Sequence, residues 1–136
     1  MEIKTGVQNY DLGGKVTVSF NPTDLHFAGK VKDGIDACIA REEAFQNFVA
    51  KTEDVGKMFL EAENADKDIE GIVNGVFGVD VVAPLCEGIS VRAWADGMPI
   101  WANILLAIMD VLEAGQSEAM KASKARIAKY TKKYGK

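Results

Sequence analysis

The sequence predicts a mainly helical α+β protein: an N-terminal β-hairpin followed by a compact bundle of about four helices, the last with a basic extension. Two observations carry this prediction. Apolar residues recur at every second position from residue 16 to residue 20, and at helical spacing after residue 21. The 136 residues, of which 48% are hydrophobic and 26% charged, fit one folded domain spanning residues 1–136.

The hairpin is expected within residues 1–20. Every second residue from Val16 to Phe20 is apolar, which is the period of a half-buried strand. Gly13 and Gly14 precede this strand and suit a tight turn, so residues 7–12 become its partner. A two-stranded hairpin is marginal alone in water, so it must pack on the helices or pair with another chain.

A helical body is expected over residues 23–118. Thr23 or Asp24 can cap its first helix by accepting from free backbone N–H groups. Gly29 and Gly34 weaken the start of that helix, so its continuity before residue 35 stays open.

The second helix of the body has an apolar stripe at steps of three, four and seven residues, and Gly78 is its expected stop. One buried face is predicted from these residues: Val55, Phe59, Ala62, Ile69, Val73, Val76 and Phe77.

The second half of the body contains one strongly apolar segment. Residues 79–86 predict a short helix or turn, and residues 89–97 a loop or short extended segment. Pro99 suits the first turn of the next helix, with Asp96 as its candidate cap. That helix runs to Leu112 and is apolar on nearly every side, so it is expected at the centre of the core or under another chain.

Charge is sorted between the body and residues 119–136, the basic tail. The last sixteen residues carry seven Lys or Arg and no acid, which leaves nine bases (16 − 7) and all 20 acids in the other 120 residues. The pattern predicts an acidic body with a basic, helical, solvent-facing extension. Two interpretations stay open. The tail either docks, on its own body, a second copy or an acidic partner, or it is a frayed, solvated helix end.

No catalytic residue, cofactor site or metal site is expected, and the chain is not expected to be an enzyme. His26 and Cys38 lack a third orienting residue, so a solvated or helix-capping histidine is favoured over a nucleophilic pair. Cys38 and Cys86 are expected to be reduced thiols of a cytosolic protein. The acidic run from Glu61 to Glu70 reads as a solvated helix face, since the calcium-loop pattern is missing.

The expected partner is a protein. The net charge of −4 gives no general reason for nucleic-acid binding, and the longest apolar run is too short to span a membrane. Self-association is a second expectation. Exposed Trp and Met side chains favour protein contacts, although Trp101 and Trp94 also suit a core. The candidate partner-binding residues are Trp94, Met98, Trp101, Lys129, Lys132 and Lys133.

The order of elements resembles the small tail assembly chaperones of long-tailed bacteriophages. The matching stretches are residues 10–16, the hairpin; Asn21-Pro22-Thr23-Asp24, its exit into helix; Val76-Phe77-Gly78, a helix end; and the apolar helix at residues 99–112. The resemblance implies a non-catalytic chaperone that binds the tape-measure protein during tail assembly in the cytoplasm of a bacterial host. The alternative is a structural tail or head–tail connector subunit that forms a ring.

Overall fold

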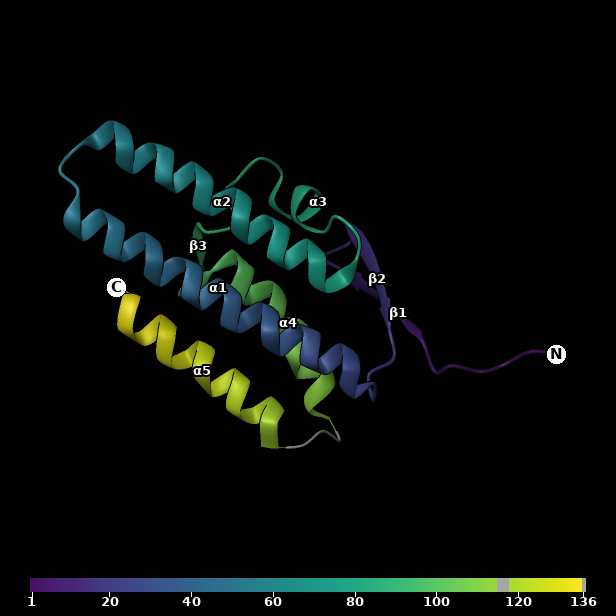
Figure 1. Ribbon diagram of the computed structural model, residues 1–136. Coiled ribbons are helices and arrows are strands. Elements are labelled where there is room, and N and C mark those ends of the chain that lie inside the picture. The colour runs from purple at the N-terminus through teal and green to yellow at the C-terminus, as the bar shows by residue number, and fades with distance from the viewer. Residues whose placement is uncertain (115–117, 136) are drawn as a thin grey trace.

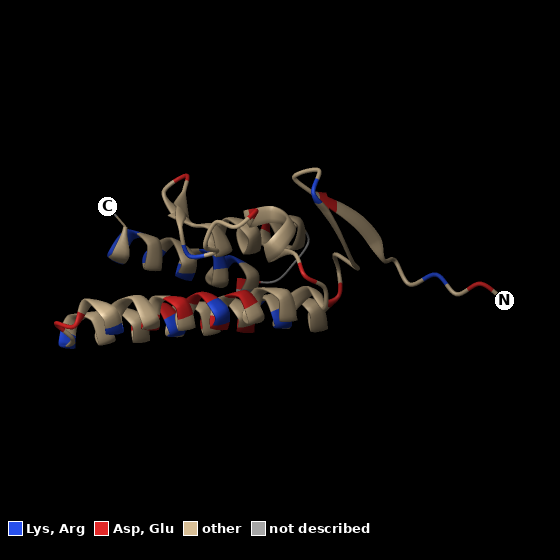
Figure 2. Cartoon of the chain, turned by 90° about the horizontal axis from the view of Figure 1, so that it is seen from above, with Lys and Arg blue, Asp and Glu red and all other residues tan. Residues whose placement is uncertain are grey.

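The computed structural model describes residues 1–114 and 118–135. It is mainly helical, with an N-terminal antiparallel hairpin followed by helices, which confirms the predicted fold class. Helices α1 (Leu25–Lys51) and α2 (Val55–Phe77) form one layer, and α4 (Ile100–Glu113) and α5 (Glu118–Tyr134) pack against α1 (Figures 1 and 2). Residues 115–117 of the expected helical body and Lys136 of the basic tail lie outside the described residues.

The hairpin closes one end of the two layers. Strands β1 (Gln8–Leu12) and β2 (Val16–Phe20) pair antiparallel through a turn in which Gly13 and Gly14 have φ of 63° and 72°. Val18 and Phe20 are buried, and the rings of Tyr10 and Phe20 stack with centroids 4.4 Å apart. Because these side chains enter the core, the hairpin is stabilised by packing on the helices.

Helix α1 is continuous from Leu25 and includes both glycines. Asp24 caps it, since its Oδ1 accepts from the backbone N–H of His26 at 2.8 Å. Gly34 is buried at the crossing with α2, and a Cβ there would lie 2.7 Å from Cγ2 of Val76. The small residue therefore permits close helix packing, which offsets the weak helix propensity of glycine.

Helix α2 follows its predicted stripe only in part. It begins after Asp54, which accepts from the backbone N–H of Lys57, and ends at Gly78 with φ 72°. Ile69, Val73 and Val76 are buried, as expected. The prediction of one buried face is wrong at the first turns, because Val55 and Phe59 are 60% and 72% exposed.

The connection to α4 holds the short helix α3 (Val82–Cys86) and a small hairpin, β3 (Trp94–Ala95) with β4 (Met98–Pro99). Asp96 does not cap α4. It has φ 56° and forms the turn between the two short strands with Gly97, whereas Pro99 occupies the N-cap position. The pairing of Ala95 with Met98 holds Asp96 in a tight turn, away from the helix end.

Helices α4 and α5 complete one hydrophobic core. Trp101, Leu105 and Leu112 of α4 are fully buried. On α5, Ile127 is fully buried and Met120 is 4% exposed, so the prediction of a solvent-facing tail is wrong for this face. The tail is docked on its own body, and only its opposite face is exposed.

Ion pairs reinforce the docking of α5. Nζ of Lys124 lies 2.7 Å from Oδ1 of Asp110 on α4, and Arg126 pairs with Asp36 on α1. Burial alone would raise the pKa of Asp36, but hydrogen bonds from Arg126 and Lys32 outweigh burial and hold that pKa below its usual value.

Candidate functional site

A buried polar network joins α1, α2, α4 and the loop before β3. Glu42 is 3% exposed, and its two carboxylate oxygens accept from Arg92 Nε at 2.8 Å and Trp101 Nε1 at 3.1 Å. Arg92 also donates to Asp66 Oδ1 at 3.2 Å, and that oxygen accepts from Ser90 Oγ at 2.8 Å. These hydrogen bonds match each charge with an opposite partner, as buried ions require.

The network positions the loop that carries Trp94. Cζ of Arg92 lies 4.2 Å from the centroid of the Phe45 ring, and Arg92 Nη1 also donates to the carbonyl oxygen of Ala62. The guanidinium is therefore held between α1 and α2, two residues before Trp94. Sequence reasoning missed this network, because Glu42 and Arg92 are 50 residues apart and neither belongs to a recognisable motif.

The predicted partner-binding residues separate into buried and exposed groups. Trp101 is fully buried and donates to Glu42, so its predicted contact with a partner does not fit the folded chain. Met98 is half-buried against the core. Trp94 is 42% exposed and lines a pocket of about 380 Å³ together with Lys132. Two predicted residues 38 positions apart are thereby brought together.

The exposed face of α5 ends in lysines. Lys129, Lys132 and Lys133 are all exposed, and none of them pairs with a carboxylate among the described residues. Nζ of Lys133 lies 5.0 Å from the centroid of the Tyr134 ring. These three lysines, called the basic end below, remain available to a negatively charged group.

The largest departure from the expected burial lies at the turn between α1 and α2. Between Ile39 and Ile69, Ala65 is the one apolar residue that is buried among the described residues, although both helices continue past this point. Figure 2 shows the α1–α2 layer extending beyond the layer above it. We call this part the overhang. Its apolar members are Val55, Phe59 and Leu60, all exposed, with Phe48, Val49 and Met58, which are half-buried.

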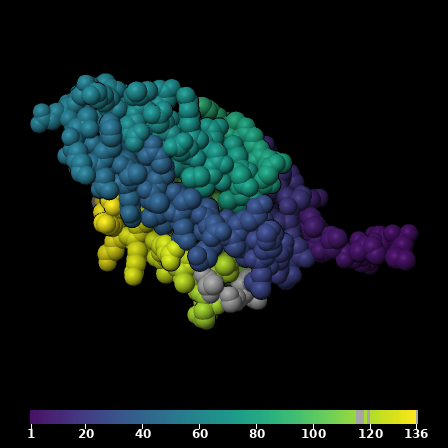
Figure 3. Space-filling view, viewed as in Figure 1, coloured from purple at the N-terminus to yellow at the C-terminus, as the bar shows by residue number. Residues whose placement is uncertain are grey.

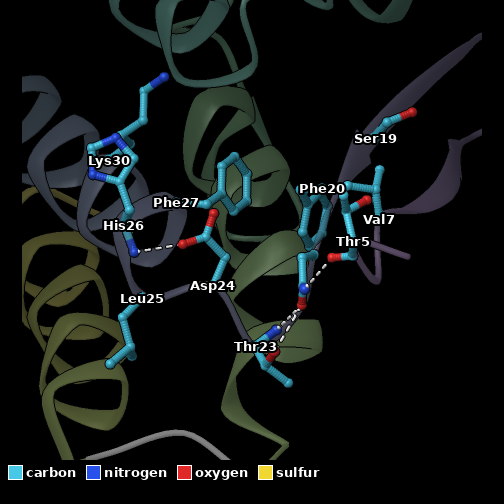
Figure 4. A pocket seen from close by; sticks show the side chains of 11 residues that line it. Thr5, Val7, Ser19, Phe20, Thr23, Asp24, Leu25, His26, Phe27 and Lys30 are labelled. Atoms are coloured by element: carbon cyan, nitrogen blue, oxygen red, sulfur yellow. Dashed lines mark hydrogen bonds between the residues drawn. The ribbon is translucent and has the colours of Figure 1, made fainter. Parts of the chain in front are cut away.

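A second surface feature is a pocket of about 830 Å³ beside the first turns of α1 (Figure 4). The stacked rings of Phe20 and Phe27, with centroids 4.5 Å apart, line it together with His26 and Lys30. The His26 side chain is exposed, as the solvated interpretation expects.

The geometry separates His26 from Cys38. Twelve residues of helix correspond to about 18 Å along the axis, so the two side chains cannot form a nucleophilic pair. Burial, with the neighbouring Glu42 carboxylate, raises the pKa of the Cys38 thiol and disfavours the reactive thiolate. Cys38 and Cys86 are both buried, free thiols.

Three carboxylates of the acidic run on α2 form ion pairs with arginines. Glu61 and Asp68 both pair with Arg41, at 3.1 Å and 2.8 Å, and Asp66 pairs with Arg92. Within the described part of the chain, no three His, Cys, Asp or Glu side chains gather where they could hold a metal ion. None of the described helices is long and apolar enough to cross a membrane.

Comparisons with protein-family models, with curated proteins and with solved structures found no match to this chain.

Proposed function

We propose that this chain is a non-catalytic tail assembly chaperone, which covers the apolar face of a helical segment of the tape-measure protein. The observation that carries the proposal is the overhang, where Phe59 and Val55 are 72% and 60% exposed, at the end of a stripe that buries Ile69, Val73 and Val76. The resemblance in the order of elements supports the identity of the partner, and with it a place in the host cytoplasm.

The fold favours a helix as the occupant. Val55 and Phe59 continue the same face of α2 that buries Ile69 and Val73. Along the covered part of the α1–α2 layer, this face lies under the second layer of the protein, which is mainly helical. A helix that docks on the overhang would extend that layer and pack by the same ridges and grooves.

The charges around the overhang favour an acidic flank on that helix. The basic end of α5 leaves three lysines without carboxylate partners among the described residues. Trp94, which shares a pocket with Lys132, adds an aromatic contact on the same side. The expected partner segment is therefore an amphipathic helix with one apolar stripe and acidic residues beside it.

The experiment co-expresses the chain with helical fragments of the tape-measure protein from the same genome and measures the soluble fraction of each fragment. We expect the wild-type chain to keep at least one amphipathic fragment soluble, and Phe59→Asp to abolish this effect. Leu25→Asp is the matched control, because Leu25 is 65% exposed but lies at the other end of α1. Equal effects of the two variants, or no solubilisation by the wild-type chain, would contradict the proposal.

A further inference from the structure

The N-terminal arm, residues 1–7, has the pattern of a strand but pairs with no strand among the described residues. Its apolar residues Met1, Ile3 and Val7 alternate with polar or small residues, and Ile3 and Val7 are 71% and 54% exposed. Figures 1 and 3 show this segment projecting away from the body. An extended segment with alternating apolar residues is suited to join the edge of a sheet.

The base of the arm is held in this projecting course. Nδ2 of Asn21 donates to the carbonyl oxygen of Thr5 at 2.8 Å. Gly6 has φ 71°, and a Cβ on Gly6 would lie 2.7 Å from the same Asn21 nitrogen. This bend directs the arm away from its own hairpin, and Gln8 is already paired with Phe20, so residues 7–8 cannot form a turn back onto β1.

The outer edge of β1 offers a matching acceptor. Among the described residues β1 pairs only with β2, which leaves its other edge open. Beside β1 lies a pocket of about 300 Å³ that is lined by Leu12, Leu85, Ile104 and Ala107, among others. An open edge next to an apolar pocket can accept both the backbone and the side chains of an added strand.

We propose that the arm of one copy of this chain pairs antiparallel with β1 of a second copy, in a reciprocal exchange. Residues directly opposite in such a pair share a face. Because β1 turns Tyr10 and Leu12 to the core, the apolar, odd-numbered arm residues must lie opposite even-numbered β1 residues. Paired residue numbers therefore sum to an odd number.

Charge selects among these registers. In the register in which paired residue numbers sum to 13, Glu2 lies opposite Asp11, and two like charges repel each other. In the register in which they sum to 15, Lys4 lies opposite Asp11 and Ile3 lies opposite Leu12. An ion pair then forms on the outer face of the sheet, and Ile3 reaches the apolar pocket. The open edge of β1 is thus occupied by the arm of a second copy, in the register in which paired residue numbers sum to 15.

Sedimentation equilibrium of the full chain, from about 1 µM to about 1 mM, tests the association. We expect a monomer–dimer equilibrium that Ile3→Asp weakens about tenfold or more, because the charge would enter the apolar pocket. Ile89→Asp is the matched control, since Ile89 is 60% exposed on the loop after α3, and it should leave the dissociation constant unchanged. A monomer at every concentration, or equal effects of both variants, would overturn the proposal.

Charge exchange tests the register. Lys4→Glu and Asp11→Lys should each weaken the dimer about fivefold, because two ion pairs become like-charge pairs. An equimolar mixture of the two single variants should regain the wild-type dissociation constant, because the mixed dimer restores an opposite pair at both positions. Failure of the mixture to recover, with both variants shown folded by circular dichroism, would refute this register.

Discussion

The burial of Ile127 predicts that the basic helix α5 is an integral part of the core. Ile127→Ala removes a fully buried side chain, which costs about 2–5 kcal/mol in comparable cores. Alanine favours helix by about 0.4 kcal/mol over isoleucine, so the net loss in the free energy of unfolding is about 1.6–4.6 kcal/mol. Urea unfolding followed by circular dichroism should show a lower midpoint with an unchanged slope.

The control for Ile127→Ala is Lys129→Ala, on the exposed face of the same helix. Lys129 has no ion-pair partner among the described residues, so its substitution should change the free energy of unfolding by no more than about 0.5 kcal/mol. If the two substitutions have equal effects, α5 is a solvated end and the reasoning from burial fails.

Deletion of residues 121–136 is a less informative test than Ile127→Ala. The deletion removes Ile127 and Tyr130 and exposes Trp101, whose ring centroid lies 5.9 Å from that of Tyr130. We expect the shortened chain to lose more stability than the point variant. Loss of partner binding in that chain would then report unfolding as well as a lost contact.

Three further substitutions and one chemical reaction test the interior. Glu42→Ala should lower the free energy of unfolding by about 3–5 kcal/mol, because it removes the more deeply buried of the two carboxylates that pair with Arg92 and leaves the Trp101 N–H without its acceptor; a loss below about 1 kcal/mol would contradict this. Gly29→Ala should raise that free energy by about 0.5–1 kcal/mol, since a Cβ there meets nothing within 4 Å. Gly34→Ala should lower it by about 1–2 kcal/mol through contact with a stiff valine, and stabilisation by both would refute the close approach. Cys38 and Cys86 should react slowly with a thiol reagent in the native chain and completely in denaturant, whereas immediate reaction of both would disprove their burial.

The local sequence pattern was sufficient to predict the helices and strands, but not which of their apolar faces are buried. The change of period after Asn21 predicted the hairpin and the helices, and Asp24 and Gly78 mark helix ends as expected. The apolar stripe of α2 could not show that Phe59 lies outside the core. Its exposure depends on how far the second layer extends, which distant packing decides.

Composition misled the sequence analysis at α5. Seven bases in sixteen residues suggested a solvated helix, yet a helix needs only one apolar stripe to dock. Met120, Ile127 and Tyr130 supply that stripe, and the lysines occupy the remaining surface. Counting charges over a segment therefore says less than their positions around the helix.

The buried network lies at the border between the core and the overhang, and this position limits what can dock there. On one side Glu42 accepts from Trp101 of the core, and on the other Arg92 lies against Phe45 and Ala62. The Arg92 side chain is only 11% exposed and is already paired with two carboxylates, those of Glu42 and Asp66. Because two negative charges face one guanidinium here, a further acidic residue at this border would be repelled. A helix that docks on the overhang should therefore place apolar side chains over the border and keep its acidic flank beside the lysines at the basic end of α5.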